Sequence, residues 1–167
     1  KRYGFKNLSI KKKFPATLFI SLEEPKFAAV LREGDKYYYL DENGGKILEV
    51  NPLDINSKDY PLIDSEMGDE ESGFMTAGGE RMSYLSQLFN ICKDNKYGFE
   101  IDRFLLDSDS NSVKMAVKGG PFVFFNIKDD LDKQLAKLIL IRDEELKDDF
   151  NKKAYIDLRY KDRVYYK

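Results

Sequence analysis

Apolar and polar residues alternate along the last part of the chain, a pattern typical of a β-strand with one buried and one exposed face. Two sets of side chains would lie on opposite faces of this strand: Ile156, Leu158 and Tyr160 against Tyr155, Asp157, Arg159 and Lys161. A turn at 161–162 and a further short strand at 163–167 follow. We expect that last strand to form the edge of a sheet, where unpaired backbone groups can bind an added strand.

The same alternation predicts paired strands in the amino-terminal part of the chain. The predicted strands of two successive hairpins are 8–10 with 17–23, and then 27–32 with 36–40, followed by 46–50. Asn43-Gly44 predicts a type I′ turn before the last of these strands, because both central positions of that turn need positive φ. Residues 51–79 show no regular period, and we interpret them as a surface connection with a short extended segment at 60–63 and an acidic stretch at 64–71.

Helical periodicity appears twice in the second half of the chain. An apolar stripe predicts a helix over 80–94, formed by Met82, Leu85, Leu88, Phe89 and Cys92. A second stripe predicts a helix over 131–142, and the charged segment 143–151 fits either a short helix or an exposed loop. Further strands are predicted at 98–106, 113–117 and 122–127. This order of strands, helix, strands, helix and strands predicts an α+β fold with a mainly antiparallel sheet and two or three helices.

Composition narrows the class of protein. The 167 residues are 42% hydrophobic, which excludes a disordered chain, and the net charge of −2 gives no general attraction for nucleic acid. No apolar run approaches the roughly 18 residues that would span a bilayer. Because the chain begins with Lys1, we expect it to be part of a longer protein whose targeting segment lies outside this sequence.

The sequence lacks histidine, the residue most often used for proton transfer near neutral pH. It contains no histidine and one cysteine, Cys92, so it has no imidazole base, no internal disulfide and no thiolate zinc site. Cys92 lies on the apolar stripe of its helix, and we expect it to be buried. We therefore predict no enzyme activity and no catalytic, cofactor-binding or metal-binding residue. A pair of catalytic carboxylates stays open, because a sequence alone does not place two acids together.

A partial calcium-loop pattern begins at Asp107. Its candidate oxygen ligands are Asp107, Asp109 and Asn111. Ser112 and Lys118 stand where such a loop needs glycine and a bidentate glutamate, so we interpret the segment as a polar hairpin turn.

Two other clusters have both a binding and a structural interpretation. The run 11–13 of three lysines could contact phosphate or lipid headgroups, or form the solvated end of a hairpin. The run 37–39 of three tyrosines could stack on bases or sugars, or pack across strands. Few basic residues accompany the tyrosines, which favours packing.

Tyr155-Ile-Asp-Leu-Arg-Tyr160, followed by Arg163-Val164, resembles the closing motif of the FtsQ/DivIB family of bitopic cell-division proteins. Further similarities follow the order of that family: 8–23 to the last hairpin of its POTRA domain, 28–45 to its short hairpin segment, 60–63 to its leucine-proline segment, and 122–138 to its late strand and helix. The chain departs from the family at Glu23-Glu24-Pro25, which lacks the arginine of the usual Glu-Arg-x-Pro.

The resemblance implies two units, 1–24 as the carboxyl-terminal hairpin of a truncated POTRA domain and 25–167 as the β domain. It implies a non-enzymatic divisome scaffold that helps to control septal cell-wall synthesis, without cofactor or nucleic acid. One helix outside this sequence would anchor the protein in the cytoplasmic membrane, with this region on the extracytoplasmic side at the septum. The implied partners are FtsB/DivIC-like and FtsL-like proteins. Carried over to this chain, the partner-binding residues are Arg159, Tyr160, Arg163, Val164, Tyr165 and Tyr166.

Two other classes of protein stay open. One is another POTRA-containing envelope assembly or secretion protein, which a second POTRA unit would favour, and the sequence shows no such repeat. The other is a cell-wall enzyme that uses carboxylates, which a deep cleft with two facing acids would favour.

Overall fold

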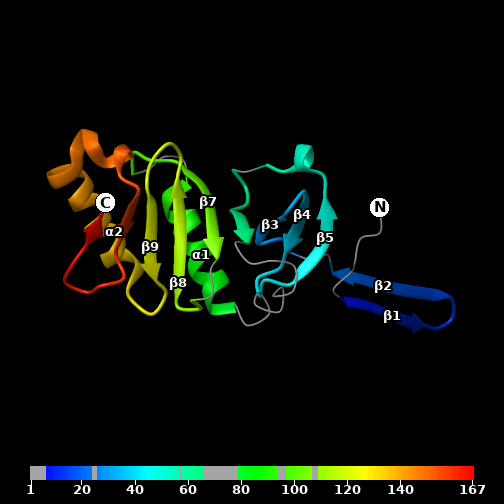
Figure 1. The fold of residues 1–167 in the computed structure, drawn as a ribbon. Coiled ribbons are helices and arrows are strands. Elements are labelled where there is room, and N and C mark those ends of the chain that lie inside the picture. The colour runs from blue at the N-terminus through cyan, green and yellow to red at the C-terminus, as the bar shows by residue number, and fades with distance from the viewer. Residues whose placement is uncertain (1–6, 24–25, 57, 66–78, 94–96, 107–108) are drawn as a thin grey trace.

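The computed structural model describes residues 7–23, 26–56, 58–65, 79–93, 97–106 and 109–167 (Figure 1). The strands in that part of the chain are β1 (Asn7–Lys13), β2 (Thr17–Glu23), β3 (Ala29–Glu33), β4 (Lys36–Leu40), β5 (Lys46–Val50), β6 (Leu62–Ser65), β7 (Ile101–Leu106), β8 (Ser112–Val117), β9 (Phe122–Asn126), β10 (Tyr155–Asp157) and β11 (Tyr165–Tyr166). The α-helices are α1 (Gly79–Cys92) and α2 (Leu131–Leu140). Shorter helical segments are Pro52–Asp54, Ile141–Leu146 and Lys147–Lys152.

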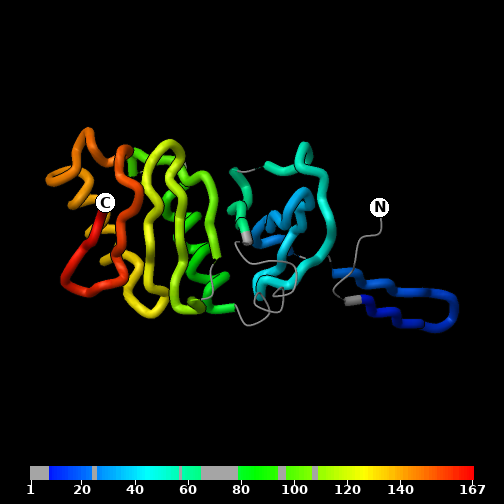
Figure 2. Tube along the Cα trace, viewed as in Figure 1, coloured from blue at the N-terminus to red at the C-terminus, as the bar shows by residue number. Residues whose placement is uncertain are grey.

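The fold is α+β, as predicted. β1 and β2 form a small sheet of their own, and the other described strands form one mixed sheet in the order β11-β10-β9-β8-β7-β6-β3-β4-β5. Most neighbours are antiparallel, whereas β3–β6, β6–β7 and β9–β10 are parallel. The trace in Figure 2 runs from the amino-terminal hairpin at one end of the molecule to the carboxyl terminus at the other.

β6 is an interior strand of the large sheet, beside the middle strand β7, which corrects the prediction of a surface connection over 51–79. Leu62–Ser65 pairs in parallel with β3 on one side and with β7 on the other, and Ile63 is fully buried opposite Phe104. Four residues are too few to show a period, and a strand that is buried on both faces does not alternate. The acidic stretch 64–71 was predicted to belong to the same surface connection, and this is wrong for Asp64, which belongs to β6. Residues 66–71 lie outside the described residues.

Two local predictions are settled by backbone geometry. Positive φ occurs at Gly44 (84°) but not at Asn43, so the type I′ turn is wrong. The Asp41 carboxylate instead accepts hydrogen bonds from the backbone N–H groups of Asn43 and Gly45, at 2.8 and 2.9 Å, which stabilises a longer turn. The segment 143–151, which had two interpretations, is helical.

The two α-helices lie on one face of the large sheet and build the core with it. Figure 1 shows α1 behind β7 and β8. Every apolar position of the stripe predicted for α1 is buried, including Cys92, and Leu135 and Leu138 of α2 are buried in the same cluster. The opposite face of the sheet carries half-buried side chains such as Phe122 and Phe124, and the Lys114 Nζ lies 4.5 and 5.6 Å from their ring centroids.

The β1–β2 hairpin exposes an apolar face. Leu8 pairs with Leu22 and Ile10 pairs with Ile20, so their side chains lie on the same side of the hairpin as Leu18. Each of these five residues is 51–59% exposed. The predicted boundary between the units 1–24 and 25–167 falls on Glu24 and Pro25, which lie outside the described residues.

Candidate functional site

The carboxyl-terminal edge of the large sheet is the candidate site that the sequence predicted. β11 is the terminal strand in the sheet order, and among the described strands it pairs on one side only, with β10. The Lys167 N–H donates to the Tyr155 carbonyl at 3.2 Å, and the Lys167 carbonyl accepts from the Ala154 N–H at 2.6 Å. Backbone groups point to alternate sides along a strand. Tyr165 and Lys167 therefore face β10, whereas the backbone groups of Val164 and Tyr166 face the open side.

The two strands at the carboxyl terminus are shorter in the structure than the sequence predicted, because β10 covers Tyr155–Asp157 and β11 covers Tyr165–Tyr166. This changes which side chains are exposed. β10 ends at Asp157, and Ile156 and Leu158 are fully buried, whereas Tyr160 is 52% exposed. The prediction that Tyr160 shares the buried face is therefore wrong, because the chain has left the strand before it reaches that residue. The Tyr160 ring meets the exposed Tyr165 ring edge to face, with 5.0 Å between the centroids.

The other predicted partner-binding residues divide into an exposed one and two that face the core. Arg163 is exposed at the turn between β10 and β11. Val164 and Tyr166 are partly buried and pack against the hydrophobic core. The Tyr166 hydroxyl donates to the Glu145 carboxylate, and this hydrogen bond raises the pKa of Tyr166. β11 is thus fixed by its side chains while one side of its backbone stays open.

Arg159 is held by contacts within the protein. Its Nε and Nη2 donate to the two carboxylate oxygens of Asp157 at 2.9 and 2.6 Å, and its Nη1 lies 3.7 Å from the Asp109 carboxylate. The guanidinium also lies over the Phe124 ring, 5.0 Å from its centroid. The hydrogen bonds to Asp157 raise the pKa of Arg159. Arg159 therefore supports the shape of the edge, and a part of its side chain reaches solvent.

A buried carboxylate links the strands at the centre of the sheet. Asp64 Oδ2 on β6 lies 2.7 Å from Arg32 Nη2 on β3 and 2.9 Å from Arg103 Nε on β7. Burial raises the pKa of Asp64, and the two arginines oppose that shift. The Asp64 carboxylate therefore links β6 to both neighbouring strands through ion pairs. The sequence did not indicate these ion pairs, because the three residues are far apart along the chain.

Asp109, one of the candidate calcium ligands, contacts other groups of the protein. Asp107 lies outside the described residues. The Asp109 carboxylate accepts a hydrogen bond from the Asn111 N–H at 3.0 Å and faces Arg159. Within the described ranges, no three His, Cys, Asp or Glu side chains are grouped in a way that could hold a metal ion.

The tyrosines at 37–39 contact neighbouring side chains. The Tyr39 ring stacks on Phe27 with 4.2 Å between the centroids, and it meets Tyr60 edge to face at 5.5 Å. Lys46 Nζ lies 4.8 Å from the Tyr38 ring centroid. Tyr38 thus packs against a residue of the neighbouring strand β5, as interpreted, whereas the two aromatic partners of Tyr39 lie just outside the strands.

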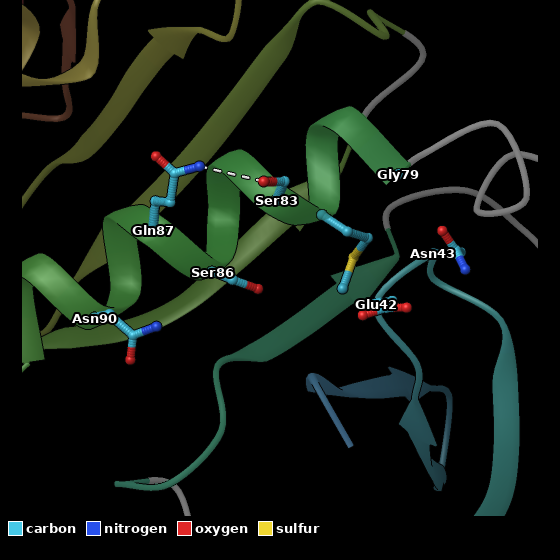
Figure 3. Close-up of a pocket in the computed structure, with 8 residues that line it drawn as sticks. Glu42, Asn43, Gly79, Ser83, Ser86, Gln87 and Asn90 are labelled. Atoms are coloured by element: carbon cyan, nitrogen blue, oxygen red, sulfur yellow. Dashed lines mark hydrogen bonds between the residues drawn. The ribbon is translucent and has the colours of Figure 1, made fainter. Parts of the chain in front are cut away.

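An open hollow lies between α1 and the turn after β4 (Figure 3). Its volume is about 470 Å³, and its lining consists of Glu42, Asn43, Gly79, Met82, Ser83, Ser86, Gln87 and Asn90. Glu42 is the one carboxylate among these described residues, so the hollow does not supply the facing pair of acids that a glycosidase would need. Gln87 donates to the Ser83 hydroxyl at 3.2 Å.

Lys137 on α2 contacts the candidate edge, and the sequence did not single it out. Its position near the end of an amphipathic helix is the usual one for a solvated lysine. Only the folded chain brings its ammonium group to the segment between β10 and β11.

Among the described helices, none combines the length and the apolar character needed to cross a membrane. A scan of the chain against protein-family models finds no match, and a search of curated proteins finds no significant match either.

Proposed function

We propose that this chain is a non-enzymatic scaffold of the bacterial division machinery, of the FtsQ/DivIB type. It acts outside the cytoplasmic membrane and binds an extended segment of an FtsB/DivIC-like partner, together with an FtsL-like protein. The observation that carries this proposal is the open side of β11 at the end of the large sheet. The resemblance of Tyr155–Tyr160 and Arg163-Val164 to the closing motif of that family gives the partner class.

The geometry of the edge fits strand addition. The outward backbone groups of Val164 and Tyr166 provide donors and acceptors for a new ladder, while Tyr165 and Lys167 keep their bonds to β10. Val164 and Tyr166 pack against the hydrophobic core and hold β11 in place before a partner binds. This lowers the entropy cost of ordering the strand on binding. The exposed Tyr160 and Tyr165 rings then offer apolar area beside the backbone, and tyrosine is among the residue types that dominate binding energy.

Changing Tyr160 to alanine should weaken binding by about 2 kcal/mol, because an exposed aromatic side chain beside the edge would be buried by the partner. The measurement is titration of an FtsB/DivIC-like extracytoplasmic segment against the wild-type chain and the variant. Phe14→Ala is the matched control, since Phe14 is 85% exposed on the distant amino-terminal hairpin. A larger loss of affinity in Phe14→Ala than in Tyr160→Ala would place the partner on the hairpin.

Changing Val164 to proline should weaken binding by about 1 kcal/mol, since it deletes one outward backbone donor from the new ladder. The fold should survive, because proline is tolerated at a sheet edge where the N–H does not bond within the sheet. The same titration measures the effect, with circular dichroism as the check on folding. Unchanged affinity in both Val164→Pro and Tyr160→Ala would rule out β11, and β5 at the opposite end of the sheet would be the next surface to test.

A further inference from the structure

Lys137 makes three hydrogen bonds to one short segment of backbone. Its Nζ donates to the carbonyl oxygens of Leu158, Tyr160 and Lys161, at 3.0, 2.9 and 3.4 Å. An ammonium group has three donors, so these contacts occupy its full donor capacity. All three acceptors lie between the end of β10 and the start of β11.

These carbonyls lie where the chain leaves the sheet. β10 ends at Asp157, and the next carbonyls need hydrogen-bond partners from outside the strand ladder. The Tyr160 carbonyl also accepts from the Arg163 N–H, at 3.5 Å. Lys137 therefore sets the path of the segment that carries the chain from the buried Leu158 to the edge strand.

The helix that carries Lys137 is itself fixed. Asp130 caps its start by accepting from the Lys133 N–H at 3.0 Å, and Leu135 and Leu138 are buried in the core. Gln134, also buried, bonds to the end of β9 and to Tyr84 on α1. A lysine on such a helix holds its acceptors at a defined distance from the core.

We propose that Lys137 is a positioning residue for the partner-binding edge, and this inference rests on the proposed function. It does not touch the partner strand. It holds the segment 158–161 so that β11 is already in place, with its outward backbone groups aligned, before a partner arrives. Without it, the partner would have to order this segment during binding, and the affinity would fall.

The test compares Lys137→Met with wild type. Methionine keeps an unbranched stem of similar length and removes the three donors. Lys133→Met is the matched control, because Lys133 is an exposed lysine one turn earlier on α2. The first readout is amide hydrogen exchange at Tyr165 and Lys167, whose N–H groups face β10. The second is the affinity for an FtsB/DivIC-like extracytoplasmic segment.

In Lys137→Met, we expect exchange at Tyr165 and Lys167 to become about tenfold faster and affinity to fall about tenfold, the size expected for lost hydrogen bonds to a charged donor. Amides in β7 and β8 should exchange as in wild type, and Lys133→Met should change neither readout. Lys137→Arg should restore part of both, since arginine also donates to carbonyls.

Each contrary outcome has its own meaning. Unchanged exchange and affinity in Lys137→Met would overturn the positioning role. A loss of affinity with unchanged exchange would mean that Lys137 contacts the partner directly, which also overturns it. Faster exchange throughout the sheet would show a role in overall stability only. If the wild-type chain binds no such segment, the proposed function fails, and the exchange readout still decides whether Lys137 positions β11.

Discussion

Replacing Phe104 by alanine is expected to lower the free energy of unfolding by about 4 kcal/mol, as is usual when a fully buried phenylalanine is truncated. Phe104 lies on β7, the middle strand of the large sheet, is completely buried, and pairs with the equally buried Ile63 on β6. The cavity would therefore open where the parallel strands join the two parts of the sheet. Chemical denaturation followed by circular dichroism measures the change, as a shift in midpoint at constant slope.

Phe122→Ala is the matched control for Phe104→Ala. Phe122 lies on the other face of the same sheet, is half-buried, and contacts Lys114 through its ring. We expect it to lower the free energy of unfolding by about 1 kcal/mol, because less apolar surface returns to water and no closed cavity forms. Equal losses in the two variants would contradict the assignment of the covered and open faces.

Replacing Gln134 by leucine is expected to lower the free energy of unfolding by about 3 kcal/mol. Gln134 is a buried polar residue of α2, and its Oε1 accepts from the Asn126 N–H at 2.9 Å. Its Nε2 donates to the Tyr84 hydroxyl oxygen at 3.0 Å and to the Asn126 carbonyl at 2.9 Å. Leucine fills nearly the same volume but leaves these groups without their partner, and an unsatisfied buried polar group carries its full desolvation cost.

Gln87→Leu is the control for Gln134→Leu. Gln87 lies on the exposed side of α1, and its amide donates to Ser83 in a contact open to solvent. Water can replace that bond, so the free energy of unfolding should change by about 0.5 kcal/mol or less. Thermal or chemical unfolding of both variants decides the comparison, and a loss in Gln134→Leu no larger than in Gln87→Leu would show that the buried network does not stabilise the fold.

Local periodicity explains why the helices and most hairpins could be predicted. The stripe of α1 repeats over fourteen residues, and the side chains that it placed on one face are buried. The hairpin of β3 and β4 was predicted for a similar reason, because its strands are adjacent in sequence and its turn contains Gly34 at positive φ. In such elements the contacts that decide the structure are made by near neighbours along the chain.

The candidate site could be predicted in outline from residue types. The tyrosines and arginines near the carboxyl terminus marked the region, and β11 does form the end of the sheet. Their individual roles were not predictable, because these depend on where β10 stops. Arg159 donates hydrogen bonds to Asp157, and Tyr160 is exposed to solvent. Lys137, on a helix about twenty residues earlier in the chain, donates to the Leu158 carbonyl.

Patterns within a few residues were enough to predict the α+β class, the helical faces and the region of the candidate edge. The assembled sheet alone makes Leu62–Ser65 an interior strand, since parallel pairing joins it to β3 and β7 through long connections. It also decided the Arg32–Asp64–Arg103 link and the Lys137 contacts, because both join residues that no local pattern relates. Burial and pairing across the chain fix those features, and they exist only once the sheet has assembled.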